Sequence, residues 1–374
     1  MQPDGGLSLP RRAFTALACL TMLACQQPST GYVIAAAGPW KEGYGKMNRL
    51  GIELAVEEIN AHGGIDGRRL NVVSRDDDGN GETAAKIAQE FVANTNISAV
   101  VGHVNSGAMV AAAKIYDGQL AALATTATSP DLTGVSPWVF RVISSDSANG
   151  IDLARFAARL GTQRAAIVYE NNAYGRGLAD AFRRSFPGDI VSIDPITDAG
   201  QQDFEPLVSY YRRTAPEIVF VAGTDASGMT LLREAKRQSL NAKFLGGDGW
   251  TGIVADTNAA EGAFVGAPFT DADTRPEVRR FVQAFLAKNN RVPDGNAALA
   301  YDATMVIAQE LAHGPTVAHA ASKRLVAIAV DQGVKAADEA MLEVQRAVLG
   351  SADFRTGVRS YRENGVGMAQ FEGA

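Results

Sequence analysis

Residues 32–75 read YVIAAAGPWKEGYGKMNRLGIELAVEEINAHGGIDGRRLNVVSR. Tyr32–Ala37 and Leu70–Arg75 are short apolar runs of the kind that form buried strands. Between them, Gly51–His62 has apolar residues at helical spacing and ends at Gly63-Gly64. A strand, a helix and a second strand in succession make a parallel β–α–β unit, so this stretch predicts a parallel sheet flanked by helices.

The same alternation continues along the chain and restarts after Gly150. Further strands are predicted at Ala99–Gly102, Ala121–Ala124, Ala165–Tyr169, Ile190–Ile193, Ile218–Ala222, Lys243–Leu245 and near Gly262–Gly266. Helices are predicted at Thr83–Asn94, Ser106–Asp117, Ile151–Leu160, Gly177–Phe186, Phe204–Arg213, Ser227–Gln238, Glu277–Lys288 and Asn296–His313. Two such runs predict an α/β protein with two doubly wound lobes.

The N-terminus has the layout of an export signal. Arg11-Arg12 supply positive charge, and Ala13–Ala24 form an apolar stretch that is shorter than the roughly 20 residues of a spanning helix. Met22-Leu23-Ala24-Cys25 resembles a bacterial lipobox, in which the cysteine becomes the lipid-modified first residue, although Met22 and Leu23 depart from the usual residues. Simple cleavage is the alternative, and Arg11-Arg12 fit either Sec or twin-arginine export. We expect residues 1–25 to be a signal peptide and residues 26–31 a tether.

The rest of the chain offers no metal, redox or nucleic-acid chemistry. Both cysteines, Cys19 and Cys25, lie in the leader, so the remainder has no disulfide and no thiol nucleophile. The net charge is −6 and there is no basic stripe, so nucleic acid is not an expected partner. We expect no metal and no cofactor, because no metal-ligand spacing relates the four histidines, which are His62, His103, His313 and His319.

The enzyme motifs that the chain suggests are incomplete. Gly43–Asn48 (GYGKMN) follows the first strand like a dinucleotide fingerprint, but Asn48 stands where the third glycine should be. There is no P-loop, no kinase motif set and no Gly-x-Ser-x-Gly nucleophile elbow. Asp76–Asn80 (DDDGN) lacks the spacing of a calcium loop, and we expect its acids to cap a helix and solvate a loop. The chain is therefore not expected to be an enzyme.

Polar, glycine-rich segments follow the predicted strands. Open α/β sheets bind ligands outside the carboxyl ends of their strands, so these segments predict a site for a small polar molecule. They are Gly38–Tyr44, Gly102–Ser106, Thr125–Ser129, Glu170–Tyr174, Gly223–Asp225 and Gly246–Trp250.

Several stretches, in order, resemble a known family. They are Leu54–Gly67 (LAVEEINAHGGIDG), Val100–Ser106 (VVGHVNS), Thr126–Leu132 (TATSPDL), Tyr174–Gly177 (YGRG) and Phe244–Gly249 (FLGGDG). Together they resemble the leucine/isoleucine/valine-binding proteins, the extracytoplasmic receptors of branched-chain amino acid ABC transporters. The similarity runs from about Tyr32 to at least Tyr301.

The resemblance implies a type I periplasmic-binding-protein fold, in which two Rossmann-like lobes joined by a three-crossing hinge close on a ligand between them. It implies an N-terminal lobe of residues 32–146 plus about 275–355 and a C-terminal lobe of 147–274 plus about 356–374. The implied function is capture of a small amino acid, branched-chain or related, for delivery to an ABC permease. We expect a monomer in the periplasm or at the cell surface that touches the membrane only through a lipid anchor.

The motifs also imply the binding residues. Ser106, helped by the backbone of Val104 and by the following helix N-terminus, would bind the ligand α-carboxylate. Thr126 and Thr128 match positions that contact the ligand ammonium and carboxylate groups. The remaining implied contacts are Tyr44 at the side-chain subsite, Asp146 at the first crossing, Tyr174 from the second lobe, and Asp248 as the partner of the α-ammonium.

Two departures put leucine itself in doubt. Thr224 stands where the leucine-binding proteins have a tyrosine, and Asp248 is one methylene shorter than the glutamate of the founding members. Other readings stay open: helix capping for Ser106 and Thr128, and a turn role for Asp248. A ligand-sensing subunit of the same fold, or a receptor for an amide, urea or an aromatic acid, is the alternative function. A hydrolase is disfavoured by the missing nucleophile elbow.

Overall fold

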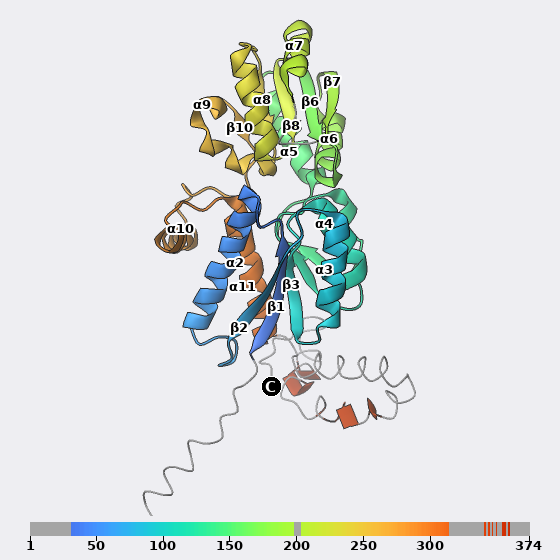
Figure 1. Cartoon of the computed structure of the whole chain (residues 1–374), viewed down its shortest axis with the longest axis vertical. Coiled ribbons are helices and arrows are strands. Elements are labelled where there is room, and N and C mark those ends of the chain that lie inside the picture. Colours follow the sequence, from blue (N-terminus) through green and yellow to red (C-terminus); the bar gives the residue numbers. More distant parts are fainter. Residues whose placement is uncertain are drawn as a thin grey trace, which may run out of the picture. The chain divides into compact units, whose positions relative to one another are not determined.

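The computed structural model describes residues 31–197 and 203–313, together with scattered positions between 340 and 359. The predicted signal peptide, Cys25 and residues 26–30 of the expected tether lie outside the described residues. Within the described ranges, two parallel five-stranded sheets form the framework (Figure 1). The predicted α/β architecture with two doubly wound lobes is confirmed.

The first sheet has the strand order β2-β1-β3-β4-β5, and every pair in it is parallel. Helices α3 and α4 cover one face of this sheet, and α2 and α11 cover the other (Figure 1). Its strands are β1 (Tyr32–Gly38), β2 (Leu70–Asp76), β3 (Ile97–Gly102), β4 (Ala122–Ala124) and β5 (Val139–Arg141). Its helices are α2 (Gly43–Ala61), α3 (Gly81–Ala93), α4 (Ser106–Tyr116) and α11 (Gly295–His313).

The second sheet has the order β10-β9-β8-β6-β7 and is again parallel throughout. Helices α5 and α6 pack on one face, and α7 and α8 pack on the other. Its strands are β6 (Arg164–Glu170), β7 (Asp189–Ile196), β8 (Ile218–Ala222), β9 (Lys243–Gly246) and β10 (Phe264–Val265). Its helices are α5 (Asp146–Arg159), α6 (Ala173–Ser185), α7 (Glu205–Thr214), α8 (Asp225–Arg237) and α9 (Thr257–Ala260).

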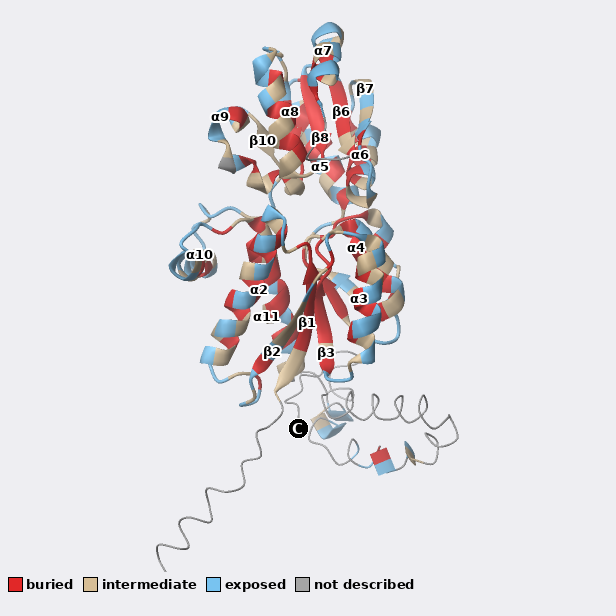
Figure 2. Cartoon of the chain, viewed as in Figure 1, coloured by how far each residue is buried: buried red, intermediate tan, exposed pale blue. Residues whose placement is uncertain are grey.

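Alternation along each strand divides the core of each lobe into two layers. In β8, Ile218 and Phe220 pack under α5 and α6, whereas Val219 and Val221 pack under α7 and α8. Because both faces are covered, all five residues of β8 are buried, and the strand reads as a continuous apolar run. Figure 2 shows the same arrangement, with buried strands enclosed by helices whose outer faces are exposed.

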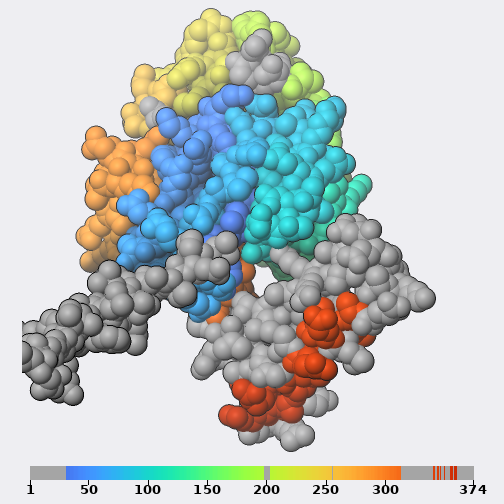
Figure 3. All heavy atoms as spheres, turned by 60° about the horizontal axis from the view of Figure 1, so that its bottom comes forward, coloured from blue at the N-terminus to red at the C-terminus, as the bar shows by residue number. Residues whose placement is uncertain are grey.

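Two segments lead from one sheet to the other. The first, residues 142–145, joins β5 to α5, and the second, residues 266–275, joins β10 to α10 (Pro276–Asn289). Helix α10 returns to the first sheet's helices and packs beside α2, as Figure 3 shows in orange and blue. The lobe boundaries expected near residues 146 and 275 stay a prediction.

The main local difference from the sequence prediction is the start of α2. The periodicity predicts a helix from Gly51, but α2 begins at Gly43. Glycines are weak helix formers, so residues 43–45 read as a loop. Gly45 is required there because a Cβ at this position would lie 2.0 Å from the Pro39 carbonyl oxygen. Tyr44 therefore lies in the first turn of a helix. Strand β5, helix α9 and the short 3₁₀ helix η2 (Asp248–Ala255) have no counterpart among the predicted elements.

Among the described helices, none has both the length and the hydropathy needed to cross a bilayer.

Candidate ligand-binding site

Each predicted site residue lies just beyond the carboxyl end of a strand. This placement is the one that parallel α/β sheets use for ligand binding, because the polar segments leaving the strands gather at one edge of each sheet. Tyr44 follows β1, Val104 and Ser106 follow β3, Thr126 and Thr128 follow β4, Asp146 follows β5, Tyr174 follows β6, Thr224 follows β8, and Asp248 follows β9.

Ser106 organises the first-lobe side of the site. It is the first residue of α4, and its hydroxyl oxygen accepts hydrogen bonds from the backbone N–H groups of Thr128 at 3.2 Å and Ser129 at 3.1 Å. The capping role considered for Ser106 and Thr128 is wrong, because Asn105 precedes α4 and Ser129 caps the 3₁₀ turn that follows Thr128. The Ser106 hydroxyl proton stays available to a ligand anion at the positive end of α4.

Hydrogen bonds also join the loops near Ser106 to one another. The Thr126 hydroxyl donates to the Val104 carbonyl oxygen at 3.1 Å, which joins the loop after β4 to the loop after β3. The Asn105 amide donates to the Tyr44 hydroxyl at 2.9 Å, and burial raises the pKa of Tyr44 to about 12. Tyr44 is thus a neutral, partly buried phenol that is hydrogen-bonded to Asn105, the residue before Ser106.

Asp248 and Tyr174 form the corresponding pair in the second lobe. The Tyr174 hydroxyl donates to Asp248 Oδ1 at 3.1 Å and accepts the Gly249 N–H at 3.0 Å. Burial raises the pKa of Asp248 to about 6, although the hydrogen bond from Tyr174 and the backbone N–H groups of Asp248 and Gly249 act in the opposite direction. Asp248 is therefore a largely ionised carboxylate at neutral pH.

Asp146 lies where the two groups meet. Its backbone N–H donates to the Thr128 carbonyl oxygen at 2.9 Å, and a Cβ on Gly177 of α6 would lie 3.6 Å from its Oδ2 atom. Burial, followed by the charge of Asp248, raises the pKa of Asp146 to about 8. Ser106, Thr128, Asp146, Tyr174 and Asp248 are thus brought together from both lobes.

Thr224 is hydrogen-bonded to the buried carboxylate of Glu170. Its N–H and its hydroxyl both donate to Glu170 Oε1, at 2.8 and 2.7 Å. The Ser227 hydroxyl donates to the same oxygen at 3.0 Å, and the Asn172 amide donates to Oε2 at 3.0 Å. The Thr224 hydroxyl therefore donates to a buried carboxylate and is not free to donate to a ligand. Its small side chain still leaves more space than a tyrosine would.

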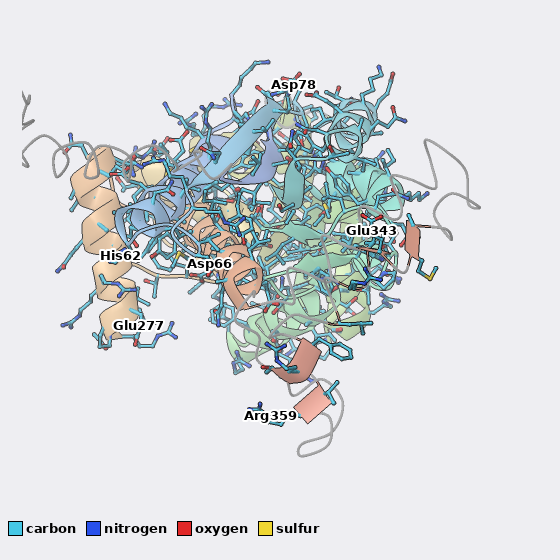
Figure 4. All side chains as sticks on the ribbon, turned by 90° about the horizontal axis from the view of Figure 1, so that it is seen from below. His62, Asp66, Asp78, Glu277, Glu343 and Arg359 are labelled. Atoms are coloured by element: carbon cyan, nitrogen blue, oxygen red, sulfur yellow. The ribbon has the colours of Figure 1, made fainter. Side chains whose placement is uncertain are left out.

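The Asp76–Asn80 segment corrects one expectation. Asn80, not one of the aspartates, caps α3 by accepting the N–H groups of Glu82 and Thr83. Asp78 does lie at the solvated edge of the molecule, where it pairs with Lys41 at 2.7 Å (Figure 4). Asp77 is fully buried, and its Oδ2 atom lies 2.7 Å from Nδ1 of His103, whose Nε2 lies 2.9 Å from the Tyr116 hydroxyl. His103 therefore has a structural role.

Over the described ranges, no cluster of three or more His, Cys, Asp or Glu side chains could hold a metal ion. A cavity of about 600 Å³ lies beside the two described crossings and shares Asp248 with the site. The rest of its lining comes from the crossings, for example Val142 and Pro268, and from α5 and α11, for example Phe156 and Leu299. The cavity therefore borders the predicted site at Asp248, but Ser106 is not among its lining residues.

Three residues that hydrogen-bond to predicted site residues were not identified from the sequence. Glu170 ends β6 inside a polar segment that the sequence singles out, so a signal was present, but its partners Thr224 and Ser227 are distant in the chain. Asn105 lies between two predicted site residues. Arg141 donates to the carbonyl oxygens of Thr128 at 3.1 Å and Ser129 at 2.9 Å, and no local pattern marks it.

Comparison with known proteins places this geometry in context. Residues 30–356 match the family model of periplasmic binding proteins. The leucine-, isoleucine-, valine-, threonine- and alanine-binding protein of Pseudomonas aeruginosa is 31% identical over 312 residues, which are 80% of this chain and 82% of that protein. The Leu/Ile/Val-binding protein of Escherichia coli is 32% identical over 282 residues, 73% of this chain and 76% of that protein.

Solved structures of substrate-binding proteins also match this chain. An ABC transporter substrate-binding protein from Desulfitobacterium hafniense, in complex with Leu, is 30% identical with a TM-score of 0.64, covering 85% of this chain and 88% of that one. A solute-binding protein from R. palustris in complex with benzoate has a TM-score of 0.70 at 20% identity, covering 86% of each chain. At that identity, the second similarity concerns the fold alone.

Proposed function

The chain belongs to the periplasmic binding protein family, and on that premise we propose that it captures a small amino acid outside the cytoplasm and delivers it to the permease of an ABC transporter. It has the type I structure of this family and is a binding protein, not an enzyme. Its relatives bind branched-chain amino acids, as their names state.

The observation that carries the proposal is the charge layout of the site. The Ser106 hydroxyl and the N-terminus of α4 offer hydrogen-bond donors and a positive helix end to an anion. Asp146 and Asp248 offer carboxylates to a cation. An α-amino acid carries one carboxylate and one ammonium group on adjacent atoms, so a single zwitterion matches both halves of the site.

Binding would be coupled to closure of the lobes. Ser106 and Thr128 belong to the first sheet's loops, whereas Tyr174 and Asp248 belong to the second. A ligand held by both sets makes its full set of contacts only when the lobes approach each other, so it favours the closed form. The closed form would be the one that a membrane permease recognises.

The ligand is proposed to be a branched-chain amino acid or a related small one. Thr224 and Tyr44 would line the side-chain subsite, with Val104 and Thr126 supplying the loop that faces the ligand backbone. A threonine at position 224 leaves more room than the tyrosine of the leucine-binding proteins. We therefore expect the side-chain preference to differ from that of a dedicated leucine receptor.

A thermal-shift assay on the purified protein tests the proposal. Leucine, isoleucine, valine, threonine and alanine would be compared with small amides, urea and benzoate. A ligand at 100 times its Kd should stabilise the protein by about 2.7 kcal/mol. Ser106→Ala and Asp248→Ala should lose the response, and Ser147→Ala, an exposed serine outside the site, should keep it.

The outcomes separate the alternatives. A response to amino acids that both site variants lose supports the zwitterion site. A response to benzoate, urea or amides alone would retain a solute receptor and remove the assigned role of Asp248. Binding without uptake, when the chain is expressed beside its permease, would favour the sensing subunit.

The protein is proposed to be periplasmic or cell-surface, exported by residues 1–25 and anchored through a lipid on Cys25. Metabolic labelling with a radioactive fatty acid tests the anchor. The wild type should incorporate label and fractionate with membranes, whereas Cys25→Ala should not. Unlabelled protein released in soluble form would instead support simple signal cleavage.

A further inference from the structure

Asp146 is a fully buried carboxylate, with a relative exposure of 0%, and neither of its oxygens accepts a hydrogen bond of normal geometry from a described residue. The Thr128 hydroxyl, also fully buried, makes no such bond within the described residues, although it is close enough to lower the pKa of Asp146. Unpaired buried charge is costly, so such a group either holds a proton or awaits a cation.

Three other segments contribute groups that act on Asp146 or on its neighbour Asp248. Asp248 in η2 contributes a second carboxylate, and Tyr174 in α6 is bonded to that carboxylate. Arg141 in β5 is the nearby cation, but its guanidinium donates to the Thr128 and Ser129 carbonyl oxygens. Neither Asp146 nor Asp248 forms an ion pair within the described part of the chain. The charge of Asp248 therefore acts on a buried Asp146 that lacks an ion-pair partner among the described residues.

Building on the proposed function, we infer that Asp146 and Asp248 hold one proton between them in the free protein, and that the ammonium group of a bound amino acid displaces this proton into solvent. The ammonium then supplies the positive charge and the hydrogen-bond donors that the pair lacks. Charge is conserved at the site: one cationic group enters and one proton leaves. Binding is thus linked to pH.

The titration of the pair has the required order. Burial and the Asp248 charge raise the pKa of Asp146 to about 8, while the Thr128 hydroxyl and Arg141 act in the opposite direction. Burial raises the pKa of Asp248 to about 6. Between these values, the pair carries about one proton as a coupled unit. An ammonium between the carboxylates lowers both pKa values and so expels the proton.

The direction of the pH dependence follows. The ligand prefers the doubly ionised pair, so lowering the pH from about 8 toward about 6 makes ligand and proton compete. Affinity should fall by about tenfold for each pH unit in this range. Leucine itself stays zwitterionic there, because free α-carboxyl groups titrate near 3.5 and the charged amino acid ammonium group titrates above the range.

Isothermal titration calorimetry tests the inference. Leucine would be titrated into the protein at pH 7 in phosphate and in Tris, whose ionisation enthalpies differ, so the difference in heat counts the protons released. We expect about one proton for the wild type and near zero for Asp146→Asn, which preserves shape but cannot ionise. Asp180→Asn, at the surface of α6 and paired with Arg183, should match the wild type.

The outcomes are distinguishable. A wild type that binds leucine with equal heats in both buffers, or whose Kd is flat between pH 6 and pH 8, overturns the inference while leaving the proposed function intact. Equal proton release by wild type and Asp146→Asn overturns the role of Asp146. Failure to bind any of the tested amino acids overturns both proposals. Should Asp146→Asn not fold, the wild-type pH series decides alone.

Discussion

Asp146 and Glu170 are both buried carboxylates close to the site, but their surroundings are opposite. Glu170 accepts hydrogen bonds from Thr224, Ser227 and Asn172, so its charge is distributed over several donors. Asp146 has none from the described residues. The first carboxylate holds the loops around it together, whereas the second has the unsatisfied acceptors on which the proposed ammonium contact rests.

Glu170→Gln should destabilise the protein. The amide replaces one acceptor oxygen by a donor and removes the charge that strengthens these hydrogen bonds, so donors of Thr224, Ser227 or Asn172 lose their partner. Hydrogen bonds to charged groups contribute about 1.5–3 kcal/mol each. Urea unfolding should therefore show a loss of about that size, whereas Glu53→Gln, in an exposed ion pair with Arg49, should change stability by less than about 0.5 kcal/mol.

Asp146→Asn should change how stability depends on pH. An unfolded aspartate has a pKa of about 3.9. When the pKa in the folded state is higher, ionisation of the aspartate lowers the stability of the folded state. The cost of Asp146 is absent below about pH 4 and grows as the pH rises toward about 8, where it is complete. The melting temperature of the variant relative to wild type should therefore rise from pH 4 to pH 8 without ligand. A constant difference would contradict the raised pKa.

At the scale of elements, the sequence predicts the apolar strands and helices well and their polar ends poorly. The helix expected from Gly51 begins at Gly43, because contacts with Pro39 rather than helix propensity decide its first turn. The placement of site residues beyond strand ends could be predicted, since it follows from parallel topology. The Glu170–Thr224 and Arg141–Thr128 contacts could not, since they join loops that are distant in the chain.

Gly45→Ala and Gly43→Ala form a matched pair that tests the first turn of α2. A methyl group at Gly45 would lie 2.0 Å from the Pro39 carbonyl oxygen, whereas one at Gly43 has no heavy atom within 4 Å. Gly45→Ala should lower the melting temperature and weaken ligand binding, because Tyr44 shares this turn. Gly43→Ala should be neutral or stabilise by up to about 1 kcal/mol. Equal effects of the two changes would contradict the packing argument.

At the scale of the whole molecule, the loops that follow the carboxyl ends of the strands in both sheets carry the residues of the proposed site. The segment from β4 to α5 links them directly, because the Asp146 N–H of the second lobe's first helix bonds to the Thr128 carbonyl oxygen of the first lobe's loop. Movement about the crossing at residues 142–145 therefore moves Asp146 together with the loop that carries Thr128. If Asp146 and Thr128 contact the ligand as proposed, lobe movement changes these contacts.

Small-angle X-ray scattering tests the coupling of ligand and lobe movement. Saturating leucine should reduce the radius of gyration of the wild type, because a zwitterion bridging Ser106 and Asp248 favours approach of the lobes. Asp248→Ala should show no reduction at the same leucine concentration. A wild type that binds leucine by calorimetry at an unchanged radius of gyration would argue against hinge closure.

The packing of Trp250 has a consequence for spectroscopy. This tryptophan is fully buried two residues after Asp248, and its indole occupies the space that side chains at Gly228 and Gly246 would fill. Trp138, in contrast, is 42% exposed. The molecule therefore contains a buried intrinsic fluorophore two residues from the carboxylate proposed to bind the ligand ammonium, and we expect its emission to change on ligand binding without any attached dye.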